Sequence, residues 1–368
     1  MRNANWIKVF VIMAMAGIVC LCMYNYFADP VNYFSREYSA QKPWDGSQYF
    51  KVNYVSAHPE KYDCFVIGGS NSGVLNPDLI DKYTDYNTYS MSFSVGNWYS
   101  YYIYIKFLVE NTDAKCIVLH LSSTEPRYDK EDISSSDDMK LPAMLGNDTF
   151  EKIEEKADFL LMHFSPKRAR KEDVIFLKEN GMADWSFMQE KYDEDPEGYI
   201  QKYVLDDYEG RISEMGSVEL DHEKVENALS YAKQIKKLCD DRGVDLVVIS
   251  GPVFILRRTY FECDTYYDYL KSLTTIMDIY DFSDMTEINA NPYNFRDSGH
   301  YNDIMGEKVI DAVFGKNGSE IGGIKLTSDN VDEYIRNRKE KFEELLGEYR
   351  NTGTIRYQSY DSESRVKE

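Results

Sequence analysis

The amino-acid sequence predicts an α/β protein: a three-layer α/β/α domain with a mostly parallel, doubly wound sheet, preceded by one N-terminal transmembrane helix. Three observations predict this class. An uncharged apolar segment lies near the N-terminus, four short apolar runs follow it, and segments with helical periodicity separate those runs. Short unbroken apolar runs are typical of strands buried on both faces of a parallel sheet, and the connecting helices cover those faces.

The N-terminal segment carries no charge between Lys8 and Asp29. As a helix, residues 6–27 would span about 33 Å, close to the thickness of one hydrocarbon core. Basic residues precede the segment and an acidic chain follows it. We therefore expect a single-pass cell-membrane protein with a cytoplasmic N-terminus and an extracytoplasmic globular domain. The length of the apolar stretch favours an uncleaved anchor, residues 1–29, over the alternative of a cleaved signal peptide.

Residues 30–60 show no clear hydrophobic period, and we expect them to form a linker. The expected strands are residues 64–67, 116–121, 244–249 and 279–282. The expected helices are residues 98–109, a helix from an Asp221 N-cap to Gly243, and residues 266–277. These elements together predict one domain over residues 61–315.

Residues 126–220 interrupt this alternation with acidic segments that contain Met and Phe. We expect them to form an inserted, partly helical cap over one end of the sheet. After the domain, residues 316–368 predict a helix capped by Ser328 and then a polar, disordered tail from Asn351.

Charge and composition exclude several classes of function. The chain has 63 acidic and 42 basic residues and a formal net charge of -21, so a nucleic-acid backbone would be repelled. The five histidines are scattered and the six cysteines lack metal-ligand spacing, so we expect neither a metal site nor a cofactor.

A serine follows the first predicted strand directly. Gly68 and Gly69 permit a tight turn before Ser70, at the edge where a parallel sheet presents the carboxyl ends of its strands. Late in the domain, Asp297 lies three residues before His300. This spacing allows the carboxylate to orient one ring nitrogen while the other accepts the serine proton, which predicts a Ser-His-Asp catalytic site.

These two motifs, Gly69-Ser70-Asn71-Ser72 and Asp297-Ser298-Gly299-His300, resemble those of the SGNH (GDSL-like) hydrolase superfamily, whose sheet is flavodoxin-like. The resemblance implies Ser70 as nucleophile, His300 as base and Asp297 as its orienting group. It also implies oxyanion donors: the N–H of Ser70 and a glycine after the second strand, matched by Gly96. A third donor is an asparagine in a Gly-x-Asn-Asp motif, which is missing after residues 116–121, so Asn97 or Ser122 is expected to substitute.

The anchor followed by this strand and a late Asp-x-x-His is also similar to DltD-like and other membrane-attached polysaccharide O-acetylation proteins. That similarity implies an extracytoplasmic acyltransferase or carbohydrate esterase acting on O-acyl groups of a cell-surface or secreted polymer, beside a multispanning membrane O-acyltransferase. The alternative is a noncatalytic partner or scaffold of that acyltransferase. The missing Gly-x-Asn-Asp keeps this alternative open.

Overall fold

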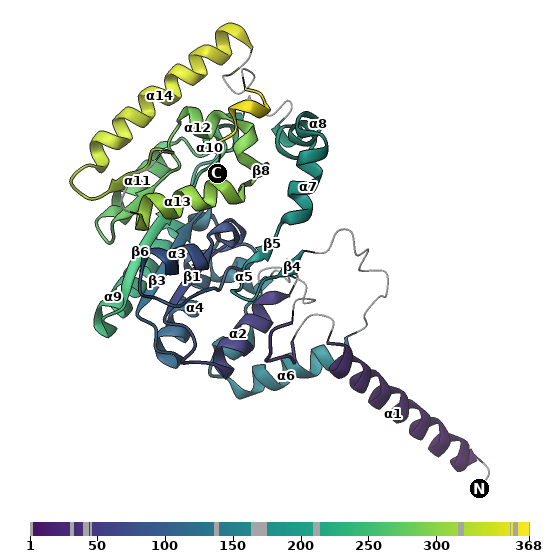
Figure 1. Ribbon diagram of the computed structural model, residues 1–368. Helices are drawn as coiled ribbons and strands as arrows, with labels where there is room; N and C mark the ends of the chain where they lie inside the picture. The colour runs from purple at the N-terminus through teal and green to yellow at the C-terminus, as the bar shows by residue number, and fades with distance from the viewer. Residues whose placement is uncertain are drawn as a thin grey trace.

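The computed structural model describes residues 3–29, 33–39, 44, 46–135, 140–162, 175–208, 214–315, 320–353, 355 and 360–367. A six-stranded sheet forms the centre of the molecule (Figure 1). Its strands are β1 (Cys64–Gly68), β2 (Thr88–Ser90), β3 (Cys116–Leu121), β6 (Asp245–Ser250), β7 (Ile279–Asp281) and β10 (Ile324–Leu326).

The strand order is β10-β7-β6-β3-β1-β2. All neighbouring pairs are parallel except β10 and β7, which are antiparallel. From β1 the chain moves outward to β2 and then returns to the other side of β1 to form β3. The order in which strands are added to the sheet therefore reverses between β1 and β3, which creates a topological switch point. α/β sheets of this kind bind ligands at the carboxyl ends of the strands beside such a point.

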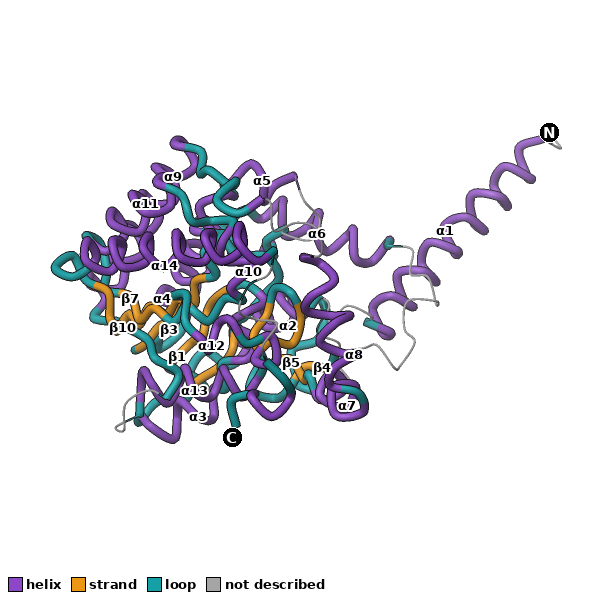
Figure 2. The backbone as a smooth tube through the Cα atoms, turned by 90° about the horizontal axis from the view of Figure 1, so that it is seen from above, coloured by secondary structure: helices purple, strands orange, loops and turns teal. Residues whose placement is uncertain are grey.

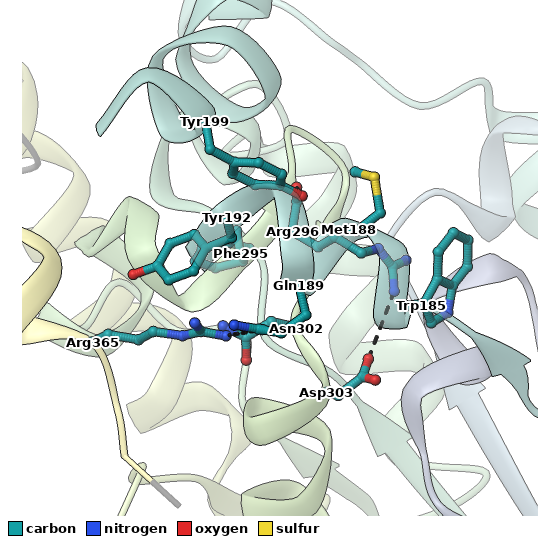
Figure 3. Close-up of a pocket in the computed structure, with 10 residues that line it drawn as sticks. All are labelled: Trp185, Met188, Gln189, Tyr192, Tyr199, Phe295, Arg296, Asn302, Asp303 and Arg365. Atoms are coloured by element: carbon teal, nitrogen blue, oxygen red, sulfur yellow. Dashed lines mark hydrogen bonds and ion pairs between the residues drawn. The ribbon is translucent and has the colours of Figure 1, made fainter. Parts of the chain in front are cut away.

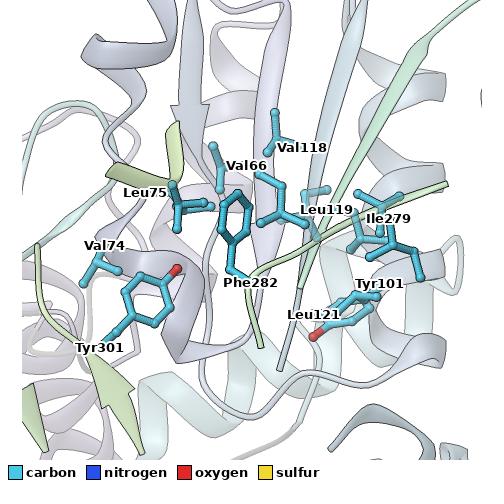
Figure 4. Packing of buried hydrophobic residues seen from close by; sticks show 14 of the residues in the cluster. Val66, Val74, Leu75, Tyr101, Val118, Leu119, Leu121, Ile279, Phe282 and Tyr301 are labelled. Carbon is cyan, nitrogen blue, oxygen red and sulfur yellow. The ribbon is translucent and has the colours of Figure 1, made fainter. Parts of the chain in front are cut away.

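Helices cover both faces of the sheet, which confirms the α/β class. Figure 2 shows the strands between α9 (His222–Arg242) and α11 (Asp264–Thr274) on one side and α3 (Pro77–Tyr83) and α13 (Asp303–Phe314) on the other. Helix α4 (Trp98–Asn111) packs against α9. Every residue of β1, β2 and β3 is buried, and Figure 4 illustrates the packing of the core around them.

The structure confirms both capping signals predicted for α9. The Asp221 side chain accepts from Lys224 N at 3.0 Å, and Gly243 ends the helix at a φ of 65°. The cap expected at Ser328 is wrong, because α14 (Val331–Thr352) begins after Asn330. A turn delays the helix: Asn330 Oδ1 accepts from Thr327 N at 2.8 Å.

The expected linker contains a helix of the domain itself, α2 (Ser47–Ala57), so the linker assignment is wrong for these residues. Phe50 and Val52 are completely buried in the core. Lys51 lies between these two apolar residues and is also buried, so the sequence of this helix shows no clear hydrophobic period. The Lys51 ammonium donates to the Ser92 carbonyl at 2.7 Å and lies 4.2 Å from the centre of the Trp44 ring.

The insertion between β3 and β6 is partly helical. Its regular elements are α5 (Lys130–Ser135), α6 (Thr149–Leu161), β4 (Phe176–Leu177), β5 (Ala183–Asp184), α7 (Ser186–Glu194) and α8 (Pro196–Ile200). The described part of the C-terminal tail is ordered against the domain, contrary to the expectation of disorder. Val366 N donates to Asn294 Oδ1 at 2.9 Å, and Asn291 Nδ2 donates to the Ser364 carbonyl at 2.7 Å.

Helix α1 (Asn3–Ala28) extends away from the rest of the molecule (Figure 1). Its segment Asn5–Ala28 is long and apolar enough to cross a membrane, and none of its most apolar window is buried within the protein.

Candidate active site

The turn after β1 positions the serine. Gly68 has no room for a side chain, since a Cβ there would lie 2.8 Å from that of Ser72 and 2.9 Å from the His120 carbonyl. The Ser72 hydroxyl donates to the Gly69 carbonyl at 2.7 Å and closes the turn. Ser70 thus begins a short 3₁₀ helix, Ser70–Val74, at the carboxyl end of β1 and beside the switch point of the sheet.

A two-stranded hairpin positions the aspartate and the histidine. It comprises β8 (Phe295–Asp297) and β9 (His300–Tyr301). Within the connecting turn, Gly299 N donates to Asp297 Oδ1 at 2.8 Å. The inserted segment holds this turn from outside, because Ser298 N donates to the Tyr203 carbonyl at 2.9 Å. Asn71 Nδ2 donates to the Gly299 carbonyl at 3.1 Å and ties the hairpin to the serine turn.

The fold brings the three predicted side chains into one hydrogen-bonded line. Ser70 Oγ lies 2.6 Å from His300 Nε2, although 230 positions separate the two residues. His300 Nδ1 lies 2.6 Å from Asp297 Oδ1. Serine, imidazole and carboxylate are therefore arranged for transfer of the serine proton to the imidazole.

The carboxyl of Asp297 is held in its charged form. Burial alone would raise its pKa, but the charge and hydrogen bond of His300, the guanidinium of Arg296 and the N–H of Gly299 together lower the pKa to about 2. The carboxylate therefore stays ionised at neutral pH and accepts the Nδ1 proton of His300. Nε2 then faces Ser70 with its lone pair.

Arg296 is a charged neighbour of this site that sequence reasoning missed. Its side chain is 4% exposed, and its guanidinium lies 3.8 Å from both Asp297 Oδ2 and Asp303 Oδ1. Figure 3 shows the guanidinium between Asp303 and Trp185, 3.5 Å from the centre of the indole ring, in the wall of a cavity of about 30 Å³. The only indication of Arg296 in the sequence is its position directly before Asp297.

Two backbone N–H groups lie beside the serine as the resemblance implied. A Cβ built on Gly69 would lie 3.0 Å from Gly96 N, so the Gly96 loop passes directly over the serine turn. In the described part of the chain, neither Ser70 N nor Gly96 N donates to another protein group. Both donors are thus available to an oxyanion.

Neither residue expected to replace the missing third donor is free to do so. Asn97 caps α4: its Oδ1 accepts from Ser100 N at 2.8 Å, and its Nδ2 donates to the carbonyls of Tyr128 and Asp129 at 3.2 and 3.1 Å. Its expected role as an oxyanion donor is therefore corrected to a structural one. Ser122 N donates to Glu125 Oε1 at 2.5 Å and is likewise engaged.

Glu125 and Tyr101 form a buried pair behind the Gly96 loop that the sequence did not indicate. The Tyr101 hydroxyl donates to Glu125 Oε1 at 3.1 Å, and burial raises the pKa of the Glu125 carboxyl. A Cβ on Gly96 would lie only 2.3 Å from that hydroxyl. Tyr101 therefore packs closely against Gly96, a contact that carries no sequence signature.

Replacing Gly96 with Ala is expected to slow the reaction of Ser70 with a fluorophosphonate by about 10²-fold, because the new methyl group displaces Tyr101 or the Gly96 N–H. The measurement is the second-order rate constant for reaction with a fluorophosphonate. Gly73→Ala is the matched control, because a Cβ there meets Trp44 and Ser92 at 3.7 and 3.8 Å, which are ordinary contacts. Equal rates for both variants would exclude a role for the Gly96 N–H.

His120 also lies close to the site, but it is buried and contacts a tyrosine rather than the serine. Its Nε2 is 3.0 Å from the Tyr301 hydroxyl. Burial lowers the pKa of His120 to about 3, whereas an unfolded chain binds the proton near pH 6.5. Between these values the unfolded chain binds more protons, so stability is present above about pH 6.5 and is lost as the pH falls.

The free energy of unfolding is therefore expected to fall by about 1.4 kcal/mol more in the wild type than in His120→Gln between pH 7.5 and 5.5. Urea titrations of both proteins at the two pH values measure this difference. Parallel pH dependences would mean that His120 is protonated inside the folded protein.

In the described residues, no group of three or more His, Cys, Asp or Glu side chains is arranged to hold a metal ion. Fold and site together define an α/β protein with a Ser-His-Asp constellation at the switch point of a mostly parallel sheet. No family model, curated protein or solved structure matches the chain.

Proposed function

We propose that the protein is an SGNH-type serine enzyme, an O-acyltransferase or esterase, that acts on O-acyl groups of a cell-surface or secreted polymer. One observation carries the proposal: the continuous line from Ser70 Oγ through the His300 ring to Asp297 Oδ1, with both contacts at 2.6 Å. Two N–H groups beside the serine and the position of the site at the switch point support it.

In the proposed reaction, Ser70 Oγ attacks the carbonyl carbon of an ester while its proton passes to His300 Nε2. The carbonyl electron pair moves to oxygen, and the N–H groups of Ser70 and Gly96 stabilise the resulting oxyanion. When the tetrahedral intermediate collapses, the alcohol leaves with the proton from His300. A polymer hydroxyl or water then attacks the acyl-enzyme, with His300 again accepting a proton, and Ser70 is regenerated.

Helix α1 supports the location that we propose for this chemistry. The helix is long and apolar enough to span a membrane, and basic residues precede it. We therefore infer an anchor with a cytoplasmic N-terminus and the domain outside. An anchored extracytoplasmic enzyme of this kind would meet cell-surface polymers directly and would work beside a multispanning membrane O-acyltransferase.

The test is to react the full-length protein with a fluorophosphonate and to locate the adduct by mass spectrometry. The expected result is one adduct on Ser70 that is absent from Ser70→Ala. Ser72→Ala is the control, because Ser72 lies in the same turn but donates to the Gly69 carbonyl instead of contacting His300. Labelled acyl groups that appear on polymer or in solution then distinguish transfer from hydrolysis.

A noncatalytic scaffold is the competing function, and one observation favours it. Asn97 and Ser122 both donate hydrogen bonds to other protein groups. Neither of them can therefore act as the third oxyanion donor that the SGNH superfamily has. A folded protein that gives no fluorophosphonate adduct, together with polymer acylation that survives Ser70→Ala in cells, would establish the scaffold and contradict the enzyme.

A further inference from the structure

Helix α6 (Thr149–Leu161) is fixed to the domain along one side only. On that side Phe159 stacks on Tyr33, with ring centroids 4.1 Å apart, and Glu155 Oε2 accepts from Ala143 N at 2.8 Å. Both side chains are buried. The helix therefore has a defined orientation, and its remaining surface is presented outward.

The outward surface of α6 carries an apolar stripe with exposed charged side chains beside it. Phe150 is 84% exposed, Ile153 is 61% exposed and Leu161 is 50% exposed. With Ala157 they occupy helical positions i, i+3, i+7 and i+11, which lie on one face. We call these four residues the α6 stripe. A row of large exposed apolar side chains on a rigid helix is typical of an interaction surface.

The α6 stripe ends where α1 joins the domain. The side chain of Asn25, on the last turns of α1, donates to the carbonyls of Leu160 and Met162 at the end of α6, each at 2.8 Å. Asn25 is 1% exposed, so its side chain is buried within this junction. Figure 1 shows α6 lying across the end of α1 that faces the domain, and the exposed apolar surface of α1 begins there with Phe27 at 77%.

We propose that the α6 stripe inserts into the surface of the lipid bilayer that α1 spans. The inference rests on the membrane anchor of the proposed function. We favour lipid as the occupant because the stripe ends at the junction with α1, whose own exposed apolar surface is long enough to cross a bilayer.

The charges around the stripe define the kind of contact. Glu151, Glu154 and Asp158 outnumber the exposed Lys156 on the outward half of α6, so anionic lipid does not attract this helix. The contact is apolar and is expected to form on neutral lipid and to be insensitive to salt. Attachment at both α1 and α6 would fix the distance and orientation of the domain relative to the membrane. Attachment through α1 alone would leave the domain free to rotate.

The experiment places the photo-crosslinker benzoylphenylalanine in the full-length protein, reconstituted into phosphatidylcholine liposomes. It replaces Ile153 in the stripe, Ile12 in α1 as the membrane reference, or Lys233 on the exposed side of α9 as the matched surface control. After irradiation, mass spectrometry counts lipid adducts. We expect lipid adducts at positions 12 and 153, at least about tenfold above position 233, and unchanged in high salt.

Lipid adducts at position 12 but not at 153 would overturn the inference and leave the anchor intact. The same holds for adducts at 153 that join two protein chains, since a protein partner would then cover the stripe. Absence of lipid adducts at position 12 as well would contradict the anchor itself. None of these outcomes depends on Ser70, so a failure of the enzymatic proposal remains separately measurable.

Discussion

Replacing Asp297 with Asn is expected to slow the reaction of Ser70 with a fluorophosphonate by about 10⁴-fold at neutral pH. The Asp297 carboxylate accepts from His300 Nδ1 at 2.6 Å, which leaves the lone pair of Nε2 directed at Ser70. An Asn amide in the same place can donate to Nδ1 instead. The ring then carries its proton on Nε2 and no longer accepts the proton of the serine.

The measurement is the second-order rate constant of labelling, with circular dichroism to show that the variant is folded. Asp303→Asn is the matched control, because Asp303 Oδ1 lies 3.8 Å from the same Arg296 guanidinium but has no hydrogen-bond partner among the described residues. Its rate is expected to stay within about threefold of the wild type. A wild-type rate in Asp297→Asn would remove the carboxylate from the proposed mechanism.

Replacing Glu262 with Leu is expected to lower the free energy of unfolding by about 3–5 kcal/mol, because Arg258 loses its buried ion-pair partner and Arg338 keeps only the longer pair with Asp281, at 3.8 Å. Glu262 accepts from Arg258 Nε at 2.6 Å and from Arg338 Nη2 at 2.9 Å, and also from the Tyr267 hydroxyl at 2.6 Å. The three charged side chains are 1% exposed or less. This cluster joins α10 (Ile255–Thr259), α11 and α14.

Urea titration followed by circular dichroism measures the loss. The control is Asp241→Asn, which breaks the Lys237–Asp241 pair. That pair has the same i,i+4 spacing and the same 2.6 Å separation as Arg258–Glu262, but its side chains are 75% and 58% exposed. Its loss is expected to cost less than about 0.5 kcal/mol. Equal losses in the two variants would show that burial does not set the strength of these pairs.

Sequence patterns predicted best the elements that one local feature defines, such as continuous burial in a strand or capping residues at the ends of a helix. Strand β3 has the predicted bounds, Cys116–Leu121, because every one of its residues is buried. Helix α9 likewise begins after its Asp221 cap and ends at Gly243. By contrast, the edge strands β2 and β10 have three residues each, too few for any period to appear.

The errors occurred where a distant partner changes the meaning of a residue. Lys51 looks like a solvent-exposed residue, but Ser92 and Trp44 accommodate it inside the core, and so α2 was mistaken for linker. Asn97 follows the implied oxyanion glycine, but the start of α4 uses its Oδ1 and the distant Tyr128 carbonyl accepts from its Nδ2. In each case the local sequence pattern was intact and the tertiary contact decided the outcome.

The sequence by itself determined the α/β class, the apolar N-terminal helix and the three residues of the candidate site. These features depend on local periodicity, on glycine turns and on residue types that chemistry requires together. Only the tertiary structure decided that Ser70 and His300 touch, that Tyr101 and Glu125 support the Gly96 loop, and that α6 rests on α1. Those relations join segments far apart in the chain, and the packing of the whole domain, which local patterns do not encode, sets their distances.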